Sequence, residues 1–238
     1  MAHQKNIKLQ GTVENIIFYA SNGHALIRSK PSIVRQSNAT KKAASLFGEA
    51  VKISANLRAT VQFLLPNSKD RNMMHRLDAT FINWLRTGQS ASGNHEPPVP
   101  FIPGFEFNLE SQLSEKLKLK LTISKSNENF IIVKVPAFVP VQKIVAPADT
   151  SSVRLKIVAV AYDFDNQSIV RAGLKEILIP YSSSEVTEQQ IVFDLKPKTG
   201  DLYMAVIALN YYTSADGSTG LNDSMKWKPA AIAQAIIF

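Results

Sequence analysis

The residues of this chain whose type and spacing best suit chemistry are Asp163 and Asp165, in the segment Tyr162-Asp-Phe-Asp-Asn166. On an extended segment both side chains project from one face, and carboxylate oxygens are the ligands that Ca²⁺ prefers. Two carboxylates are fewer ligands than a calcium site needs, and Asp side chains commonly cap the turns that follow strands. We therefore expect a turn here, with a metal site as the open alternative. The pair also resembles the two acids of a glycosidase, but no sugar cleft or raised-pKa acid accompanies it.

The remaining polar residues do not combine into a catalytic pattern. The chain has no Cys, and its four histidines are far apart, without a second ligand at metal-binding spacing. It also lacks a Gly-x-Ser-x-Gly elbow, a phosphate loop and a dinucleotide fingerprint. The sequence therefore predicts a non-enzymatic protein with no catalytic residues, no cofactor and no metal. The histidines are His3, His24, His75 and His95.

Positive charge is concentrated in the first ninety residues. Residues 1–90 contain 13 of the 27 Lys and Arg but only four acids, a formal charge of +9, whereas residues 91–238 contain 14 bases and 15 acids. Such an abrupt change indicates two physically different modules and an acidic partner for the first. The candidate interaction residues are Lys41, Lys42, Lys52, Arg58, Lys69, Arg71, Arg76 and Arg86.

Three interpretations of these cations stay open. They can neutralise the phosphate backbone of a nucleic acid, with salt-sensitive binding, face acidic patches on neighbouring copies, or form the solvated side of two amphipathic helices. Tyr19, Phe47 and Trp84 would stack on bases if they were exposed. The positions of Phe47 and Trp84 on apolar helical stripes instead favour burial.

The elements that position these cations are a hairpin and two helices. Residues 7–30 alternate around an Asn22-Gly23 turn, the strongest short signal for a β-hairpin. From Asn38, apolar residues recur at steps of three and four as far as Pro66, and Ser37 or Asn38 can cap the start of that helix. A second helix is predicted over about 68–87. Residues 88–100 are rich in Pro and small polar residues and predict a linker or an exposed arm.

Everything after the linker has the pattern of strands. They are expected at 101–109, 116–123, 129–135, 153–163, 169–180, 186–195, 201–212 and 230–238. This spacing, without intervening helices, favours an antiparallel immunoglobulin-like β-sandwich, and Tyr203 stands where such folds place a Tyr whose hydroxyl bonds back to the preceding loop. The predicted fold is α+β, with a basic hairpin and two-helix module at 1–90, a Pro-rich linker at 91–100 and the sandwich at 101–238.

The last predicted strand keeps its apolar character to the final residue. An apolar strand must pair within its own sheet or along the edge of a neighbour's sheet. Ile232, Ile236 and Phe238 are therefore candidates for an assembly strand. An exposed Tyr211, Tyr212 or Trp227 on the same domain would suit the face of a sugar ring.

The first third of the chain resembles a group of uncharacterised proteins common in Bacteroidota, which begin with a Gly-x-Val hairpin, continue into a long basic helix and end in a β domain. The resemblance covers residues 9–66 and implies this order of elements, but it implies no active site. The matching segments are Gly11-Thr12-Val13, Phe18-Tyr19, Asn22-Gly23, Arg28-Ser-Lys-Pro31, Asn38-Ala-Thr40, Phe47-Gly48 and Phe63-Leu-Leu-Pro66.

The bulk properties are those of an ordinary globular protein, with 45% hydrophobic residues and a net charge of +8. No apolar run is long enough to span a membrane, and no signal peptide is visible, so we expect synthesis in the cytoplasm, with release in a particle as a further alternative. The leading hypothesis is a structural protein that self-associates, as part of a phage-like particle or a filament. The alternatives are a nucleic-acid-associated protein and a glycan-binding β-sandwich.

Overall fold

The structure, a computed structural model, describes residues 3–5, 8–33, 35–65, 71–90, 101–126, 130–195, 198–220 and 224–237. It is an α+β fold, as predicted, in which the strands pair antiparallel. The chain divides into two compact units, an N-terminal unit of residues 1–44 and a main unit of residues 45–238.

The N-terminal unit contains a four-stranded sheet in the order β1-β2-β3-β4. Asn22 and Gly23, with φ angles of 50° and 81°, form the two-residue turn between β3 and β4, where Ser21 pairs with His24. This confirms the predicted hairpin. The strands are β1 (His3–Lys5), β2 (Lys8–Val13), β3 (Ile16–Ser21) and β4 (His24–Ser29).

Helix α1 (Asn38–Val61) contains the boundary between the two units. Ser37 caps its start as predicted, because the Ser37 Oγ accepts a hydrogen bond from the Thr40 N–H at 3.1 Å. A short 3-10 helix, η1 (Gln62–Leu64), follows α1, and the second predicted helix is α2 (Arg71–Ser90). The two helices are joined where the buried Ser54 hydroxyl donates a hydrogen bond to the Asp78 carboxylate.

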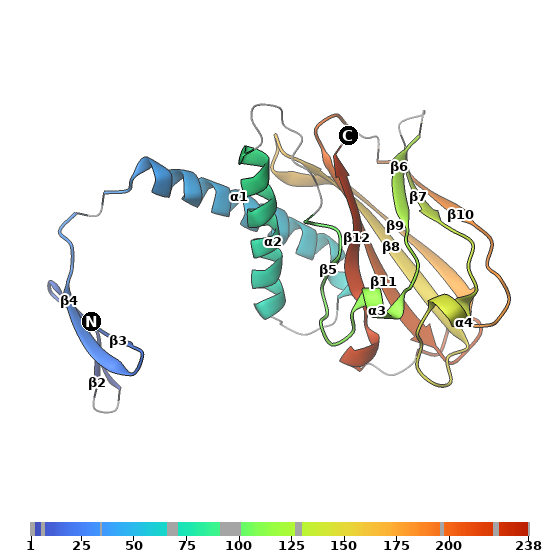
Figure 1. Ribbon diagram of the computed structural model, residues 1–238, viewed down its shortest axis with the longest axis horizontal. Helices are drawn as coiled ribbons and strands as arrows, with labels where there is room; N and C mark the ends of the chain where they lie inside the picture. Colours follow the sequence, from blue (N-terminus) through green and yellow to red (C-terminus); the bar gives the residue numbers. More distant parts are fainter. Residues whose placement is uncertain are drawn as a thin grey trace. The chain divides into compact units, whose positions relative to one another are not determined.

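The main unit has three layers: the helices, a five-stranded sheet and a three-stranded sheet (Figure 1). The large sheet has the order β5-β12-β11-β8-β9 and the small sheet the order β10-β7-β6. The large sheet contains β5 (Phe105–Glu106), β12 (Ala230–Ile237), β11 (Leu202–Tyr212), β8 (Ser152–Asp163) and β9 (Ser168–Pro180). The small sheet contains β10 (Gln189–Phe193), β7 (Ile131–Val135) and β6 (Thr122–Lys125), and the short helices are α3 (Leu113–Lys116), α4 (Pro140–Lys143) and η2 (Met225–Trp227).

Two separate hydrophobic cores lie on the two faces of the large sheet. Alternate residues of β8, such as Ile157, pack with the small sheet, and the residues between them, such as Val158, pack with the helices. Because both faces are covered, β8 and β11 are nearly continuous apolar runs instead of alternating ones. Phe81 and Trp84 of α2 are fully buried in the core between the helices and the sheet.

This packing differs from the predicted division into a helical module at 1–90 and a β domain at 101–238. The apolar stripes of α1 and α2 meet the large sheet, so from residue 45 onward the helices share one compact unit with the strands. The predicted linker at 91–100 lies outside the described residues.

Most strand boundaries agree with the predictions to within three residues, with two exceptions. Only Phe105 and Glu106 of the expected strand at 101–109 pair with β12. In the lysine-alternating segment at 116–123, Leu117 and Leu121 are buried as the alternation predicts, but regular pairing begins only at Thr122.

Candidate functional site

The sheet of the N-terminal unit has an uncovered apolar face. Val13 pairs directly with Ile16, and Phe18 pairs with Ile27, so the four side chains project from one side of the sheet. Val13 is 51% exposed, Ile16 45% and Ile27 67%, and Phe18 is half-buried. We call this set of four residues the open face.

No side chain that the structure describes between residues 9 and 44 is buried. A sheet gains stability when one apolar face packs against another layer, because apolar surface is then removed from water. The open face is therefore an apolar surface that no layer within the N-terminal unit covers.

The same unit is strongly basic. Residues 1–44 contain seven Lys and Arg and one acid, Glu14, a formal charge of +6. All the ion pairs between described residues lie in the main unit. The guanidinium of Arg28 lies 5.6 Å from the ring centroid of Tyr19, on the side of the sheet opposite the open face. The described cations of this unit thus form no ion pair with an acid of their own unit.

The predicted cations of the helices are divided between the two units. Lys41 and Lys42 are exposed in the N-terminal unit. In the main unit, the Lys52 Nζ donates to the Gln167 Oε1 at 2.6 Å, and the Arg58 Nε donates to the Ser54 carbonyl of its own helix at 3.3 Å. Arg86 is exposed near the end of α2. Lys69 and the side chain of Arg71 lie outside the described residues.

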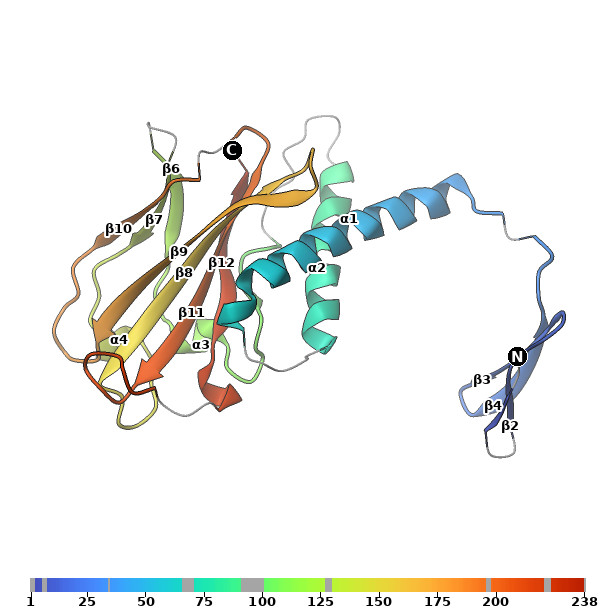
Figure 2. The same ribbon diagram turned by 180° about the vertical axis from the view of Figure 1, so that it is seen from behind.

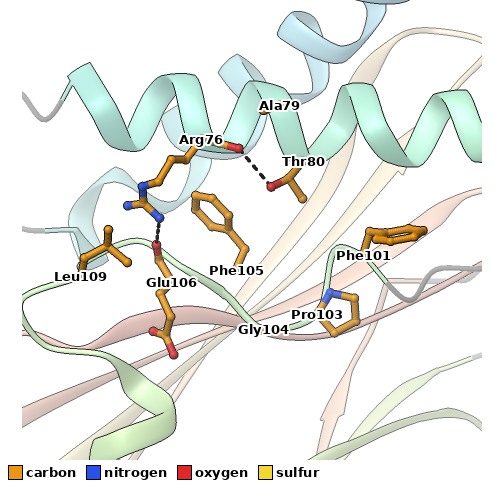
Figure 3. Close-up of a pocket in the computed structure, with 9 residues that line it drawn as sticks. All are labelled: Arg76, Ala79, Thr80, Phe101, Pro103, Gly104, Phe105, Glu106 and Leu109. Atoms are coloured by element: carbon orange, nitrogen blue, oxygen red, sulfur yellow. Dashed lines mark hydrogen bonds between the residues drawn. The ribbon is translucent and has the colours of Figure 1, made fainter.

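Arg76 points into the protein beside a pocket of about 450 Å³ between α2 and the β5 segment (Figure 3). Its Nη1 donates to the Glu106 carbonyl at 2.9 Å, and its guanidinium lies 5.2 Å from the ring centroid of Phe105. Its Nε and Nη2 are buried without a hydrogen-bond partner among the described residues. Arg76 therefore joins α2 to β5 instead of presenting charge to a nucleic acid.

Three aromatic residues were considered for stacking on bases, and they differ in their exposure. Trp84 is buried, as predicted, whereas Phe47 is 55% exposed and the prediction of its burial was wrong. The side of α1 that packs with the large sheet carries Ala50 and Ile53, and Phe47 lies off that side. Tyr19 is 39% exposed and partnered by Arg28.

Asp163 caps the turn between β8 and β9, as expected. Its carboxylate accepts hydrogen bonds from the backbone N–H of Asp165 at 2.8 Å and from the backbone and side-chain nitrogens of Asn166 at 3.1 and 2.8 Å. The hydrogen bonds from Asn166 are the main cause that holds the pKa of Asp163 below its usual 3.8. Lys198 forms ion pairs with Asp163 and Asp165 at 3.6 and 3.2 Å. Among the described residues, no three His, Asp or Glu side chains are grouped closely enough to hold a metal ion.

We expect the Asp163→Ala variant to have a lower thermal midpoint than the wild type at pH 7. A carboxylate whose pKa is depressed in the fold contributes stability above its unfolded pKa and loses that contribution as the pH falls through its folded pKa. The difference in midpoint should therefore narrow as the pH falls below 3.8. Asp165→Ala, which removes an 84% exposed side chain, is the matched control and should change the midpoint much less. Equal losses in the two variants at pH 7 would contradict this role of Asp163.

The C-terminal strand pairs within its own sheet, one of the two outcomes that the sequence left open. β12 lies between β11 and β5, Ile232 is fully buried, and Ile236 packs against the core. These two candidates for an assembly strand are thus paired and packed within the chain, and Phe238 lies outside the described residues.

Among the aromatic residues considered for glycans, Tyr211 is buried and its hydroxyl donates to the Val145 carbonyl.

Sequence reasoning located the N-terminal hairpin but missed its open face. The available signal was the direct pairing of Val13 with Ile16 and of Phe18 with Ile27, which follows once the turns are assigned.

Comparison of the chain with protein families, with curated proteins and with solved structures finds no match. None of the helices in the described part of the chain is long and apolar enough to cross a membrane.

Proposed function

We propose that this chain is a non-enzymatic structural protein that self-associates, and that its N-terminal unit contacts a second copy. The observation that carries the proposal is the open face of Val13, Ile16, Phe18 and Ile27, which no other described residue of the N-terminal unit covers. The main unit, with a core on each face of its large sheet, supplies the rigid body that such an assembly repeats.

The cost of ordering the backbone and the gain from apolar burial together favour an N-terminal sheet whose open face is covered. Ordering the backbone costs about 1–2 kcal/mol per residue, and a sheet without buried side chains recovers little of that cost. Fully burying a Val, Ile or Phe side chain contributes about 1.5–3 kcal/mol. Covering the open face with a partner therefore stabilises the sheet and the association at the same time.

We further propose that β6 to β12 form an immunoglobulin-like sandwich, a common scaffold for assembly. Named in chain order A, B, C, C′, E, F and G, these strands give sheets in the order E-B-A and C′-C-F-G, which supports this assignment. Tyr203, near the start of β11, accepts a hydrogen bond on its hydroxyl from the Lys198 N–H at 3.0 Å, as the Tyr of such folds bonds to the preceding loop. A head-to-tail contact between copies builds either a closed ring, as in a particle, or an open filament.

The charge of the N-terminal unit favours one alternative, binding of a nucleic acid by this unit alone. Its +6 charge would give an affinity that falls steeply with salt. A glycan-binding surface has less support, because the ring of Tyr212 lies beneath the guanidinium of Arg154, at 4.8 Å. The structural role is preferred because it also accounts for the apolar open face.

Hydrogen exchange of the full chain at low and high protein concentration tests the proposal. We expect the amides of β3 and β4 to exchange quickly in dilute protein and slowly in concentrated protein, because association covers them. The amides of β11, in the middle of the large sheet, are the internal control and should exchange equally slowly in both. Exchange of β3 and β4 that does not depend on concentration would contradict self-association through this unit.

A further inference from the structure

Each unit has a strand at the edge of a sheet that could pair with the edge strand of the other unit in a second copy. The two strands have similar lengths and opposite charges. In the N-terminal unit, β4 is at the edge of its sheet and pairs with β3 alone among the described strands. All six of its residues are exposed. An exposed edge strand presents unpaired N–H and C=O groups to any strand that can lie beside it.

In the main unit, β10 is at the outer edge of the small sheet and pairs with β7 alone among the described strands (Figure 2). β10 has five residues against six in β4, so the lengths of the two edges agree. Val192 of β10 projects away from the core and is 48% exposed, which gives this edge an apolar side chain of its own.

Charge distinguishes β10 from the other edges of the main unit. Residues 181–195, around β10, contain Glu185, Glu188 and Asp194 and no Lys or Arg, and all three acids are exposed. Glu188 forms an ion pair with Lys134 of β7 at 2.9 Å, which leaves Glu185 and Asp194 to give the edge its negative charge. Residues 15–44, around β4, contain five Lys and Arg and no acid.

The other described edge strands of the main unit are either basic or too short to pair along the length of β4. Residues 116–125, around β6, contain four Lys, and β9 contains Arg171 and Lys175 with one acid, Glu176. β5 has only two residues. Of the described edges of the main unit that are longer than two residues, β10 is thus the one with a net negative charge. Opposite charges across an interface fix which partners and registers form.

We propose that β4 of one chain adds to the free edge of β10 in a second copy, so that the small sheet of that copy continues into the N-terminal sheet of the first. This inference rests on the proposed self-association and adds a second contact to it, because pairing along the edge of β4 leaves the open face to be covered separately. In strand addition the backbone hydrogen bonds supply the affinity, and the side chains on either side supply the specificity. The contact is head-to-tail, because β4 and β10 are different surfaces of the chain.

Cysteine cross-linking between full-length chains tests the contact, since the sequence has no Cys. One sample carries Ile27→Cys, the other carries Val192→Cys, and the mixture is treated with a short bismaleimide. We expect a cross-linked dimer containing one chain of each variant. Leu178→Cys, on the β9 edge and 39% exposed, is the matched control and should give no product with Ile27→Cys.

A charge reversal provides a second measurement on the same samples. Glu185→Lys in the Val192→Cys chain should reduce the cross-link yield by more than half at low salt and much less at high salt, because it weakens the attraction between the two edges. Cross-linking of Ile27→Cys to itself, or to Leu178→Cys in place of Val192→Cys, would overturn the contact. An associating protein without a β4–β10 product would overturn this inference alone, whereas a protein that does not associate would remove the proposed function with it.

Discussion

Replacing Phe81 with Ala should destabilise the whole main unit, by about 3–5 kcal/mol. Phe81 is fully buried between α2 and the large sheet and packs edge-on against Trp84, with 6.3 Å between the ring centroids. Its removal leaves a cavity in a core shared by the helices and the strands. Urea unfolding followed by tryptophan fluorescence measures the change, and we expect a single transition moved to lower urea.

Phe63→Ala is the matched control for this experiment. Phe63 lies in η1, close to the same helices, but is 55% exposed, and a surface truncation of this kind changes stability by about 0.5 kcal/mol or less. Two separate transitions in the wild type, with Phe81→Ala affecting only one, would show that the helices fold apart from the sheets.

Replacing Ile27 with Asp should weaken self-association by roughly a hundredfold. Ile27 is the most exposed member of the open face, and burying such a side chain contributes about 1.5–3 kcal/mol. The Ile27→Asp variant loses that contribution and adds the cost of burying a charge. Each 1.4 kcal/mol changes the affinity about tenfold. Sedimentation equilibrium over a range of concentrations measures the change.

Ile33→Asp is the control that shows whether lost burial or added charge weakens the association. Ile33 is 70% exposed and belongs to the same unit, and its replacement by Asp changes the charge of the unit by the same amount. It lies between β4 and α1, however, and outside the open face. We expect Ile33→Asp to associate almost as the wild type does. Equal weakening by the two variants would mean that the charge of the unit, and not its apolar face, drives the association.

Local signals predicted the elements of this fold well. The Asn22-Gly23 turn and the Ser37 cap depend on residues within a few positions of each other, and both form as expected. The strands β8, β9, β11 and β12 also begin and end within one residue of their predicted limits.

The grouping of the helices with the sheets was missed because it depends on contacts between distant segments. The stripe of Ala50, Ile53 and Leu57 shows that one side of α1 is buried, but it does not show against what. The missing information was in the strands, since an uninterrupted apolar run such as β11 needs cover on both faces. The small sheet covers only one face, so a third layer was required, and α1 and α2 are the helices long enough to form it.

The candidate site was predicted in part. Charge directed attention to the first third of the chain, where the N-terminal unit does hold seven bases and a single acid. Charge alone did not separate Lys41, exposed in that unit, from Arg76, which points into the interior, because the direction of a helical side chain depends on which face meets the core. The terminal residues Ile232 and Ile236 were equally ambiguous until the pairing of β12 was known.

The mass of the wild-type particle in solution, measured by sedimentation equilibrium from dilute to concentrated protein, tests the central claim most directly. Coverage of the open face by a second copy predicts a mass that rises above the 26.3 kDa of one chain as the concentration increases. The rise should persist at high salt, because apolar burial is weakened little by ions that screen charge. A mass of one chain at every concentration, in low and in high salt, would contradict the account.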